Sequence, residues 1–123
     1  MQVVRYDQGG EYVLHQDGNL RLLTVLYYIN GAGETWFPLA DSVLEPLTRA
    51  QALSHCRSLE PGRDGVLVSC EGRGTTINRG DAIAFFNYFT DGTCDWRAIH
   101  AGLPVSTTKW IYLLVSIQSH SLP

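Results

Sequence analysis

The sequence predicts an all-β (mainly β) domain that is built as a double-sheet jelly roll or a barrel. The chain has 123 residues, of which 45% are hydrophobic, and its β-rich segments are short and separated by turn formers. A chain of this length supplies one compact core and no material for a second domain. Many short strands with one minor helix in so small a chain are typical of jelly rolls and barrels. We therefore expect a single domain over residues 1–123.

The first third of the chain has the composition of antiparallel strands. Val, Leu, Ile, Tyr and Thr dominate residues 3–6, 12–15 and 21–30, and a Gly-Gly pair and an Asp-Gly-Asn run separate them. Residues 22–29 are almost continuously apolar over the length of a strand. This pattern predicts a central strand that is covered on both faces.

Residues 41–65 are expected to form an insertion between strands. Residues 46–54 favour a short helix with Thr48 as its amino-terminal cap, because a threonine hydroxyl can accept a hydrogen bond from a free backbone N–H. Residues 60–65 contain a proline and two glycines, which end any regular element. Two roles stay open for the insertion: it covers an exposed sheet, or it acts as a lid over a substrate.

Strand signals return after the insertion. They cover residues 66–69, 75–78, 82–86, 96–100 and 109–117. An Arg-Gly-Asp turn precedes the third of these segments. Together with the first three segments they give the set of short strands on which the predicted fold class depends.

Charge and composition exclude several classes of protein. A net charge of -3 and a pI near 5.7 argue against a protein that binds nucleic acid mainly through phosphates. No apolar run approaches the roughly 20 residues that span a bilayer, and the amino terminus lacks the pattern of a secretory signal. We expect a soluble protein without a membrane partner, in a compartment that the sequence does not identify. Three cysteines without CxxC spacing favour small buried thiols over disulfides.

The segment His15-Gln16-Asp17 carries the first indication of chemistry. In a strand, side chains two residues apart leave the same face, so His15 and Asp17 could bind one ion. With a second imidazole from elsewhere they would form the facial triad that holds iron(II) and leaves adjacent coordination positions open. Those positions could take a co-substrate and dioxygen together. Taken alone, the pair is more typical of a solvated strand end.

Five segments resemble blocks of the prolyl 4-hydroxylase family in the same order and with similar spacing. They are RYDQGGEYVLHQD, RLLTVLYYIN, GAGETWFP, RGDAIAFFN and WRAIHAGLPVSTTKW, which span residues 5–110. The resemblance implies a double-stranded β-helix, which is a variant of the jelly roll. It also implies a dioxygenase that depends on iron(II), uses 2-oxoglutarate as co-substrate, consumes O2 and allows ascorbate as a further cofactor.

The resemblance assigns roles to individual residues. His15, Asp17 and His100 would be the iron ligands and the catalytic set, with His100 on a late strand opposite the other two. Lys109 would bind the far carboxylate of 2-oxoglutarate, because a buried carboxylate needs a cation or strong donors. The turn before Lys109 is one residue shorter than in many relatives. Lys109 is therefore either reached by a tighter turn or shifted in register.

Three further residues fall at positions that the resemblance connects with binding. Tyr6 and Thr35 would hydrogen-bond the same end of 2-oxoglutarate as Lys109. The alternatives are a strand tyrosine with its hydroxyl in water and a turn hydroxyl that bonds to local backbone. Arg21 would line the substrate groove, and the alternative is an exposed arginine at a strand start.

The resemblance implies hydroxylation of a C–H bond, with peptidyl proline as the first substrate and with release of succinate and CO2. Other protein side chains and small molecules fit the same iron site. Two alternatives keep the fold: a cupin-like metal-binding protein, in which Lys109 has no evident use, and a non-catalytic interaction module, against which the intact triad counts. In relatives, helices before the first core strand buttress the main sheet, whereas this chain begins almost at that strand, so it is either a trimmed or minimal core or is supported by another chain. We therefore expect self-association or a partner that covers the sheet.

Overall fold

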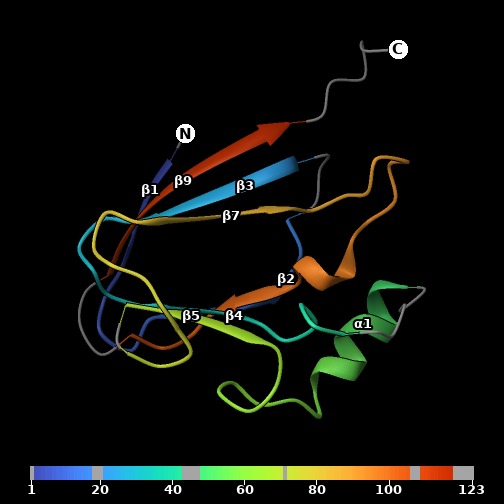
Figure 1. The fold of residues 1–123 in the computed structure, drawn as a ribbon, viewed down its shortest axis with the longest axis horizontal. Coiled ribbons are helices and arrows are strands. Elements are labelled where there is room, and N and C mark those ends of the chain that lie inside the picture. The colour runs from blue at the N-terminus through green and yellow to red at the C-terminus, as the bar shows by residue number, and fades with distance from the viewer. Residues whose placement is uncertain (1, 18–20, 43–47, 71, 106–108, 118–123) are drawn as a thin grey trace.

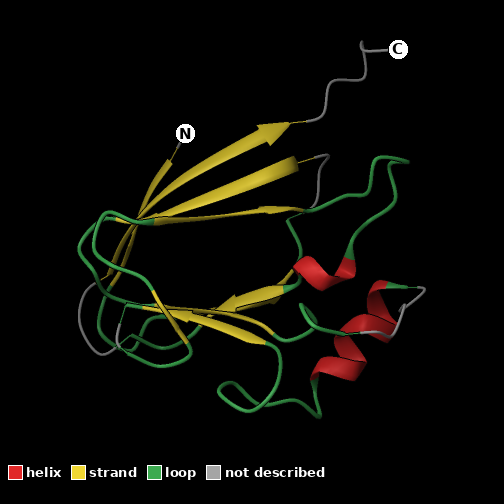
Figure 2. Cartoon of the chain, in the orientation of Figure 1, coloured by secondary structure: helices red, strands yellow, loops and turns green. Residues whose placement is uncertain are grey.

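A computed structural model of the chain describes residues 2–17, 21–42, 48–70, 72–105 and 109–117. In these ranges two β-sheets lie face to face, with one α-helix beside the lower sheet (Figure 1, Figure 2). The upper sheet has the strand order β1-β9-β3-β7 and the lower sheet has the order β2-β8-β4-β5-β6. This is the double-sheet arrangement of a jelly roll, and the predicted fold class is confirmed.

The chain crosses between the two sheets repeatedly. The upper sheet contains β1 (Gln2–Tyr6), β3 (Arg21–Tyr28), β7 (Ala82–Phe86) and β9 (Lys109–Ile117). The lower sheet contains β2 (Tyr12–His15), β4 (Glu34–Phe37), β5 (Val66–Ser69), β6 (Thr75–Thr76) and β8 (His100–Gly102). Neighbouring strands are antiparallel except for β5 and β6. As a result, segments that are far apart in the sequence face each other between the sheets.

Two sequence-based strand assignments differ from the structure. The strand predicted over residues 96–100 is wrong, because Trp96–Ala98 form a 3-10 turn, η1. The Asp95 side chain accepts a hydrogen bond from the Arg97 backbone N–H and starts this turn, so β8 begins only at His100. The strand β4 was not predicted, because its four residues follow a glycine-rich segment that is typical of a loop.

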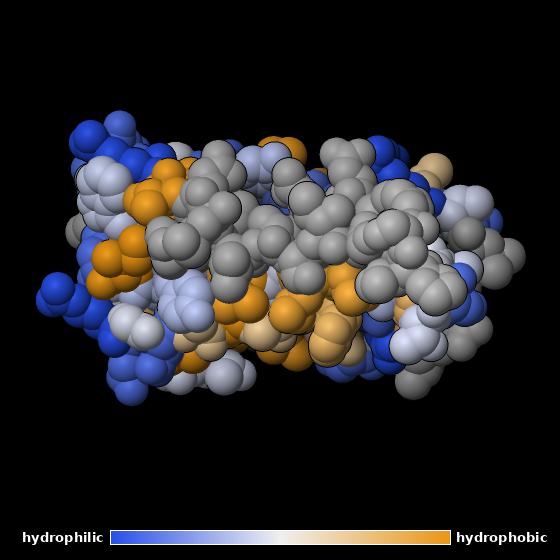
Figure 3. Space-filling view, turned by 90° about the horizontal axis from the view of Figure 1, so that it is seen from above, coloured by the Kyte–Doolittle hydropathy of each residue, from blue (hydrophilic) through white to orange (hydrophobic). Residues whose placement is uncertain are grey.

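Among the residues that the structure describes, the central strand β3 is covered on one face only, so the prediction of two covered faces is wrong. It lies between β9 and β7, and its inner residues Thr24 and Tyr28 are fully buried against the lower sheet. On the outer face Tyr27 is 36% exposed. Val3, Phe86 and Trp110 are also exposed on this face. Figure 3 shows hydrophobic residues grouped on the upper side of the molecule. Self-association or a covering partner remains a prediction.

The insertion contains α1 (Arg49–Cys56), which is capped as predicted. The Thr48 hydroxyl accepts a hydrogen bond of 3.1 Å from the backbone N–H of Gln51. Residues of α1 pack against Leu39 and Ile99 in the main cluster of buried hydrophobic side chains. The helix therefore lies beside the lower sheet and not over the exposed upper face (Figure 1).

Two further expectations from composition can be compared with the described residues. Cys56 is buried, Cys70 and Cys94 are half-buried, and all three are free thiols. This is the result that the spacing of the cysteines predicted. Among the helices in the described ranges, none combines the length and the apolar composition that crossing a membrane requires.

Candidate metal centre

The three predicted iron ligands meet between the sheets. His15 and His100 are direct partners in the register of β2 and β8, so both rings leave the same face, with ring centroids 4.2 Å apart. Oδ1 of Asp17 lies 3.2 Å from Nε2 of His15, and Oδ2 lies 3.8 Å from Nε2 of His100. One potential ligand atom from each residue falls within 4.8 Å of the others. This spacing is compatible with one shared metal ion.

The two histidines present the nitrogen that a metal ion needs. Nδ1 of His15 lies 2.8 Å from the carbonyl oxygen of Val13, and Nδ1 of His100 lies 2.9 Å from that of Ala98. Because a carbonyl oxygen only accepts hydrogen bonds, each Nδ1 carries the proton in the neutral ring. Each Nε2 then directs a lone pair toward Asp17. A nitrogen lone pair and a carboxylate oxygen repel each other across about 3–4 Å unless a cation or a proton lies between them. The two imidazole nitrogens and the Asp17 carboxylate are therefore a set of donors that fits a metal ion.

Asp17 is the anionic member of the set. Burial raises the pKa of its carboxyl, but a hydrogen bond from the protonated form of His15, the charge of protonated His100 and a hydrogen bond from Thr24 together lower the pKa further, and the net shift is downward. The carboxylate is therefore ionised at neutral pH. A carboxylate with two neutral imidazoles is the ligand set of the iron(II) facial triad.

Aromatic side chains cover the centre on the side of His100, whereas the side of His15 is more exposed. The ring centroids of Phe37 and Phe85 lie 5.5 Å and 4.9 Å from that of His100, whose side chain is almost fully buried. The side chain of His15 is more exposed, and the half-exposed Tyr12 packs beside it with ring centroids 4.2 Å apart. His15 is therefore the more accessible of the two imidazoles.

A second polar pair lies deeper between the sheets. Tyr28 of the upper sheet and Thr35 of the lower sheet are both buried, and their hydroxyl groups share a hydrogen bond. Burial raises the pKa of Tyr28 far above its ordinary value, so this phenol stays neutral. Tyr28 was not among the predicted residues. Strand alternation could have identified it, because Thr24 and Tyr28 are four residues apart and share the inner face of β3.

The backbone register brings two other predicted residues close to this pair. Lys109 of β9 is the partner of Tyr6 of β1, and the buried Ile111, two residues later, is the partner of Tyr28. Burial raises the pKa of Tyr6. The side chains of Lys109 and Arg21 lie outside the described part of the chain. The carboxylate role of Lys109 and the groove role of Arg21 stay predictions.

Two residues that were not predicted contact Asp17 directly or through one intermediate. The Thr24 hydroxyl donates a hydrogen bond of 2.8 Å to Oδ2 of Asp17, and Nδ2 of Asn87 donates one of 2.8 Å to Oγ1 of Thr24. Both Thr24 and Asn87 are fully buried. Strand alternation could have identified Thr24, whereas Asn87 follows a strand and reaches Thr24 only in the folded sheet.

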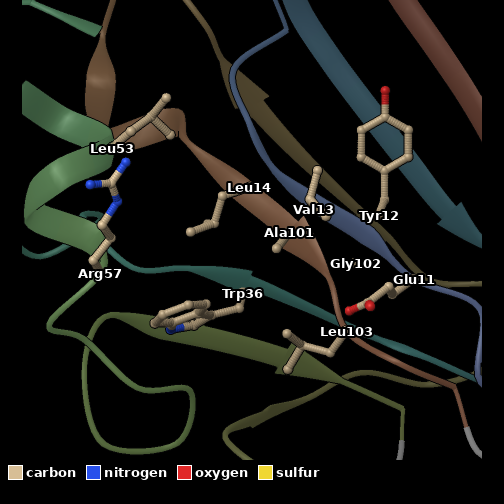
Figure 4. Close-up of a pocket in the computed structure, with 10 residues that line it drawn as sticks. All are labelled: Glu11, Tyr12, Val13, Leu14, Trp36, Leu53, Arg57, Ala101, Gly102 and Leu103. Carbon is tan, nitrogen blue, oxygen red and sulfur yellow. The ribbon is translucent and has the colours of Figure 1, made fainter. Parts of the chain in front are cut away.

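A pocket of about 470 Å³ lies apart from the metal centre, on the outer face of the lower sheet (Figure 4). Trp36, Leu14 and Leu53 line it, and Arg57 lies at its end near α1, whereas none of the three candidate ligands contributes to it. Nε1 of Trp36 donates a hydrogen bond of 2.8 Å to the carbonyl oxygen of Asp64. The insertion thus helps to form this pocket, and its role as a lid stays a prediction.

Sequence comparisons match the chain to plant enzymes of one kind. Prolyl 4-hydroxylase 2 of Arabidopsis thaliana is 34% identical and Probable prolyl 4-hydroxylase 4 of the same plant is 31% identical, each over 134 aligned residues. Each alignment covers 92% of this chain and 41% of the relative. The chain thus spans less than half the length of these relatives. No protein-family model matches it.

A structural comparison supports the fold. A viral collagen prolyl hydroxylase from Paramecium Bursaria Chlorella virus-1, solved as a 2-oxoglutarate complex, matches with a TM-score of 0.54 and 22% sequence identity. The match covers 92% of this chain and 54% of the viral chain. A truncated form of the viral protein gives the same TM-score at 20% identity. This likeness shows that the two proteins share their fold.

Proposed function

We propose that this chain, a prolyl 4-hydroxylase-like protein by its relatives and its fold, forms the core of an iron(II)- and 2-oxoglutarate-dependent dioxygenase. The proposed reaction is hydroxylation of a C–H bond, with peptidyl proline as the first substrate to test because the relatives are prolyl hydroxylases by name. The observation that carries the proposal is the meeting of His15, Asp17 and His100 between the sheets.

These three residues would hold the iron ion. Their two imidazoles and one carboxylate leave coordination positions open, as an oxygenase of this class requires. When bound, the iron and 2-oxoglutarate supply the oxidising chemistry that uses O2 and yields succinate and CO2. The chain itself orients the ligands, excludes water on the side of Phe37 and Phe85, and admits a substrate from the side of His15.

The far carboxylate of 2-oxoglutarate would lie between the sheets near Lys109. Strand alternation assigns the position of Lys109 to the same face as the buried Ile111, and its register partner is Tyr6. A carboxylate in this buried region needs a cation and strong donors. The hydroxyl groups of Tyr28 and Thr35 share one hydrogen bond, so the group that accepts within this pair can donate its own hydrogen to the carboxylate.

A turnover assay tests the proposal. The protein is incubated with iron(II), 2-oxoglutarate, ascorbate and a set of proline-containing peptides, and succinate and peptide mass are measured. We expect peptide-dependent succinate and the gain of one oxygen atom, both lost in Asp17→Ala and His100→Ala. Omitting ascorbate tests its role as a further cofactor.

One control variant and two contrary outcomes complete the test. Asp41→Ala removes an exposed carboxylate and should leave turnover unchanged. Iron binding without any consumption of 2-oxoglutarate would favour a cupin-like metal-binding protein. A chain that binds no iron would favour a non-catalytic interaction module.

A further inference from the structure

We propose that Thr24 and Asn87 are positioning residues that orient the Asp17 carboxylate and offer its Oδ1 atom to the metal ion. This inference rests on the proposed metal centre and deepens it. It assigns a role to two buried polar side chains of the upper sheet that bind no ligand themselves.

The contacts form a continuous relay of hydrogen bonds. Nδ2 of Asn87 donates to Oγ1 of Thr24 at 2.8 Å, and Thr24 donates to Oδ2 of Asp17 at 2.8 Å. Thr24 and Asn87 are 0% exposed. In such a setting, water cannot replace a lost hydrogen bond, so the orientation of each group depends on its neighbour.

The direction of the relay follows from the chemistry of its members. The NH2 of an asparagine side chain donates and does not accept, so the Thr24 oxygen must accept from Asn87. The single hydroxyl hydrogen of Thr24 is then directed to Asp17. The relay therefore delivers a donor, and never a lone pair, to Oδ2.

This contact distinguishes the two oxygens of Asp17. Oδ2 accepts the hydrogen bond from Thr24, whereas Oδ1 faces Nε2 of His15 at 3.2 Å. A hydrogen bond to one carboxylate oxygen fixes the rotation of the group and favours coordination through the other oxygen. Coordination through one oxygen keeps a further position free for the co-substrate.

Asn87 also holds the segments that carry the ligands. Its backbone N–H donates to the carbonyl oxygen of Leu22, which extends the pairing of β7 with β3 by one residue beyond the Leu23–Phe86 pair. Its backbone carbonyl oxygen accepts from Nε2 of Gln16 at 2.9 Å and from the N–H of Asp95 at 3.0 Å. Gln16 stands between His15 and Asp17, and Asp95 starts the turn that leads to His100. One residue thus fixes both ligand-bearing segments relative to the relay.

Cobalt(II) binding tests the inference without turnover. We expect Thr24→Val, which removes the hydroxyl at constant shape, to raise the Kd for cobalt(II) about 10- to 100-fold and to change the visible absorption of the bound ion. Thr24→Ser should stay close to the parent protein in both measurements. Asn87→Asp should act like Thr24→Val, because a carboxylate accepts the Thr24 hydrogen and turns a lone pair toward Asp17.

Controls separate positioning from a merely structural role. Thr76→Val makes the same change on the exposed strand β6 and should alter neither the Kd nor the spectrum. If Thr24→Val does not fold, Thr24→Ala against Thr24→Ser gives a second comparison that differs in the hydroxyl alone. A lower melting temperature with an unchanged Kd and spectrum would overturn the relay. Failure of the parent protein to bind cobalt(II) would overturn the metal centre itself and the relay with it.

Discussion

Nε2 of His15 and Oδ1 of Asp17 lie 3.2 Å apart, on residues that stand two positions apart at the end of β2. The Val13 carbonyl oxygen holds the proton of His15 on Nδ1, so a lone pair on Nε2 meets a carboxylate oxygen. A bound cation removes this repulsion. Metal binding should therefore stabilise the folded chain.

Divalent metal ions should raise the melting temperature of the protein, and a chelator should reverse the change. Saturation at 100 times the Kd corresponds to about 2.7 kcal/mol of added stability. Asp17→Ala should abolish the effect, whereas Asp41→Ala, which removes an exposed carboxylate, should keep it. Thermal unfolding with cobalt(II) or manganese(II) measures the shift. An equal shift in Asp17→Ala would show that the ion binds elsewhere.

Stability should fall at alkaline pH because of Tyr28. Its pKa is raised in the folded state, by burial first of all, so the unfolded chain releases this proton more easily. The contribution is complete below the unfolded pKa of about 10 and is lost as the pH rises above it. Tyr28→Phe should reduce this loss and should cost about 0.5–1.5 kcal/mol at neutral pH through the missing hydrogen bond to Thr35.

Urea unfolding across this pH range measures the effect. Tyr27→Phe, on the outer face of the same strand, is the matched control and should keep the slope of the parent protein. Tyr6, whose pKa is also raised by burial, should contribute a part of the slope that Tyr6→Phe removes. An identical slope in the parent protein and Tyr28→Phe would be at odds with a buried, neutral phenol.

The ion pair between Arg73 and Glu34 should stabilise the start of β4. Nε and the Nη2 nitrogen of Arg73 donate to the two carboxylate oxygens of Glu34 at 2.9 Å and 2.8 Å, and Glu34 is buried. Because Arg73 is itself about half exposed, solvent weakens the pair, and we expect Arg73→Ala to cost about 1–3 kcal/mol. Arg5→Ala breaks an exposed pair with Asp7 and should cost less than about 1 kcal/mol. Equal costs in urea unfolding would contradict the burial of Glu34.

The exposed upper face should promote association. Val3, Tyr27, Phe86 and Trp110 are exposed there, and apolar surface of this kind favours contact with another copy or a partner. Phe86→Lys should shift the protein toward the monomer in analytical ultracentrifugation. Arg79→Ala, at an exposed turn, should not. If the parent protein stays monomeric at high concentration, self-association through this face is contradicted. A different protein would then be the partner that covers it.

The candidate site was predictable from the sequence to different extents. The period of a strand places His15 and Asp17 on one face, and the same rule could have identified Thr24 and Tyr28. His100 was found only through the resemblance, because its register with His15 depends on two strands that are 85 positions apart and come together only in the folded sheet. Asn87 could not be found, since its role arises where β7 ends beside β3. The strand predicted at residues 96–100 was wrong because Asp95 caps a turn there.

Anaerobic titration of iron(II) and 2-oxoglutarate shows whether the chain binds the two together at the proposed centre. The visible charge-transfer band that forms when 2-oxoglutarate chelates iron(II) should appear in the parent protein and be absent in Asp17→Ala. Lys109→Ala should need more 2-oxoglutarate to reach the same band. Iron binding without a band at any concentration of 2-oxoglutarate would contradict the proposed 2-oxoglutarate-dependent dioxygenase.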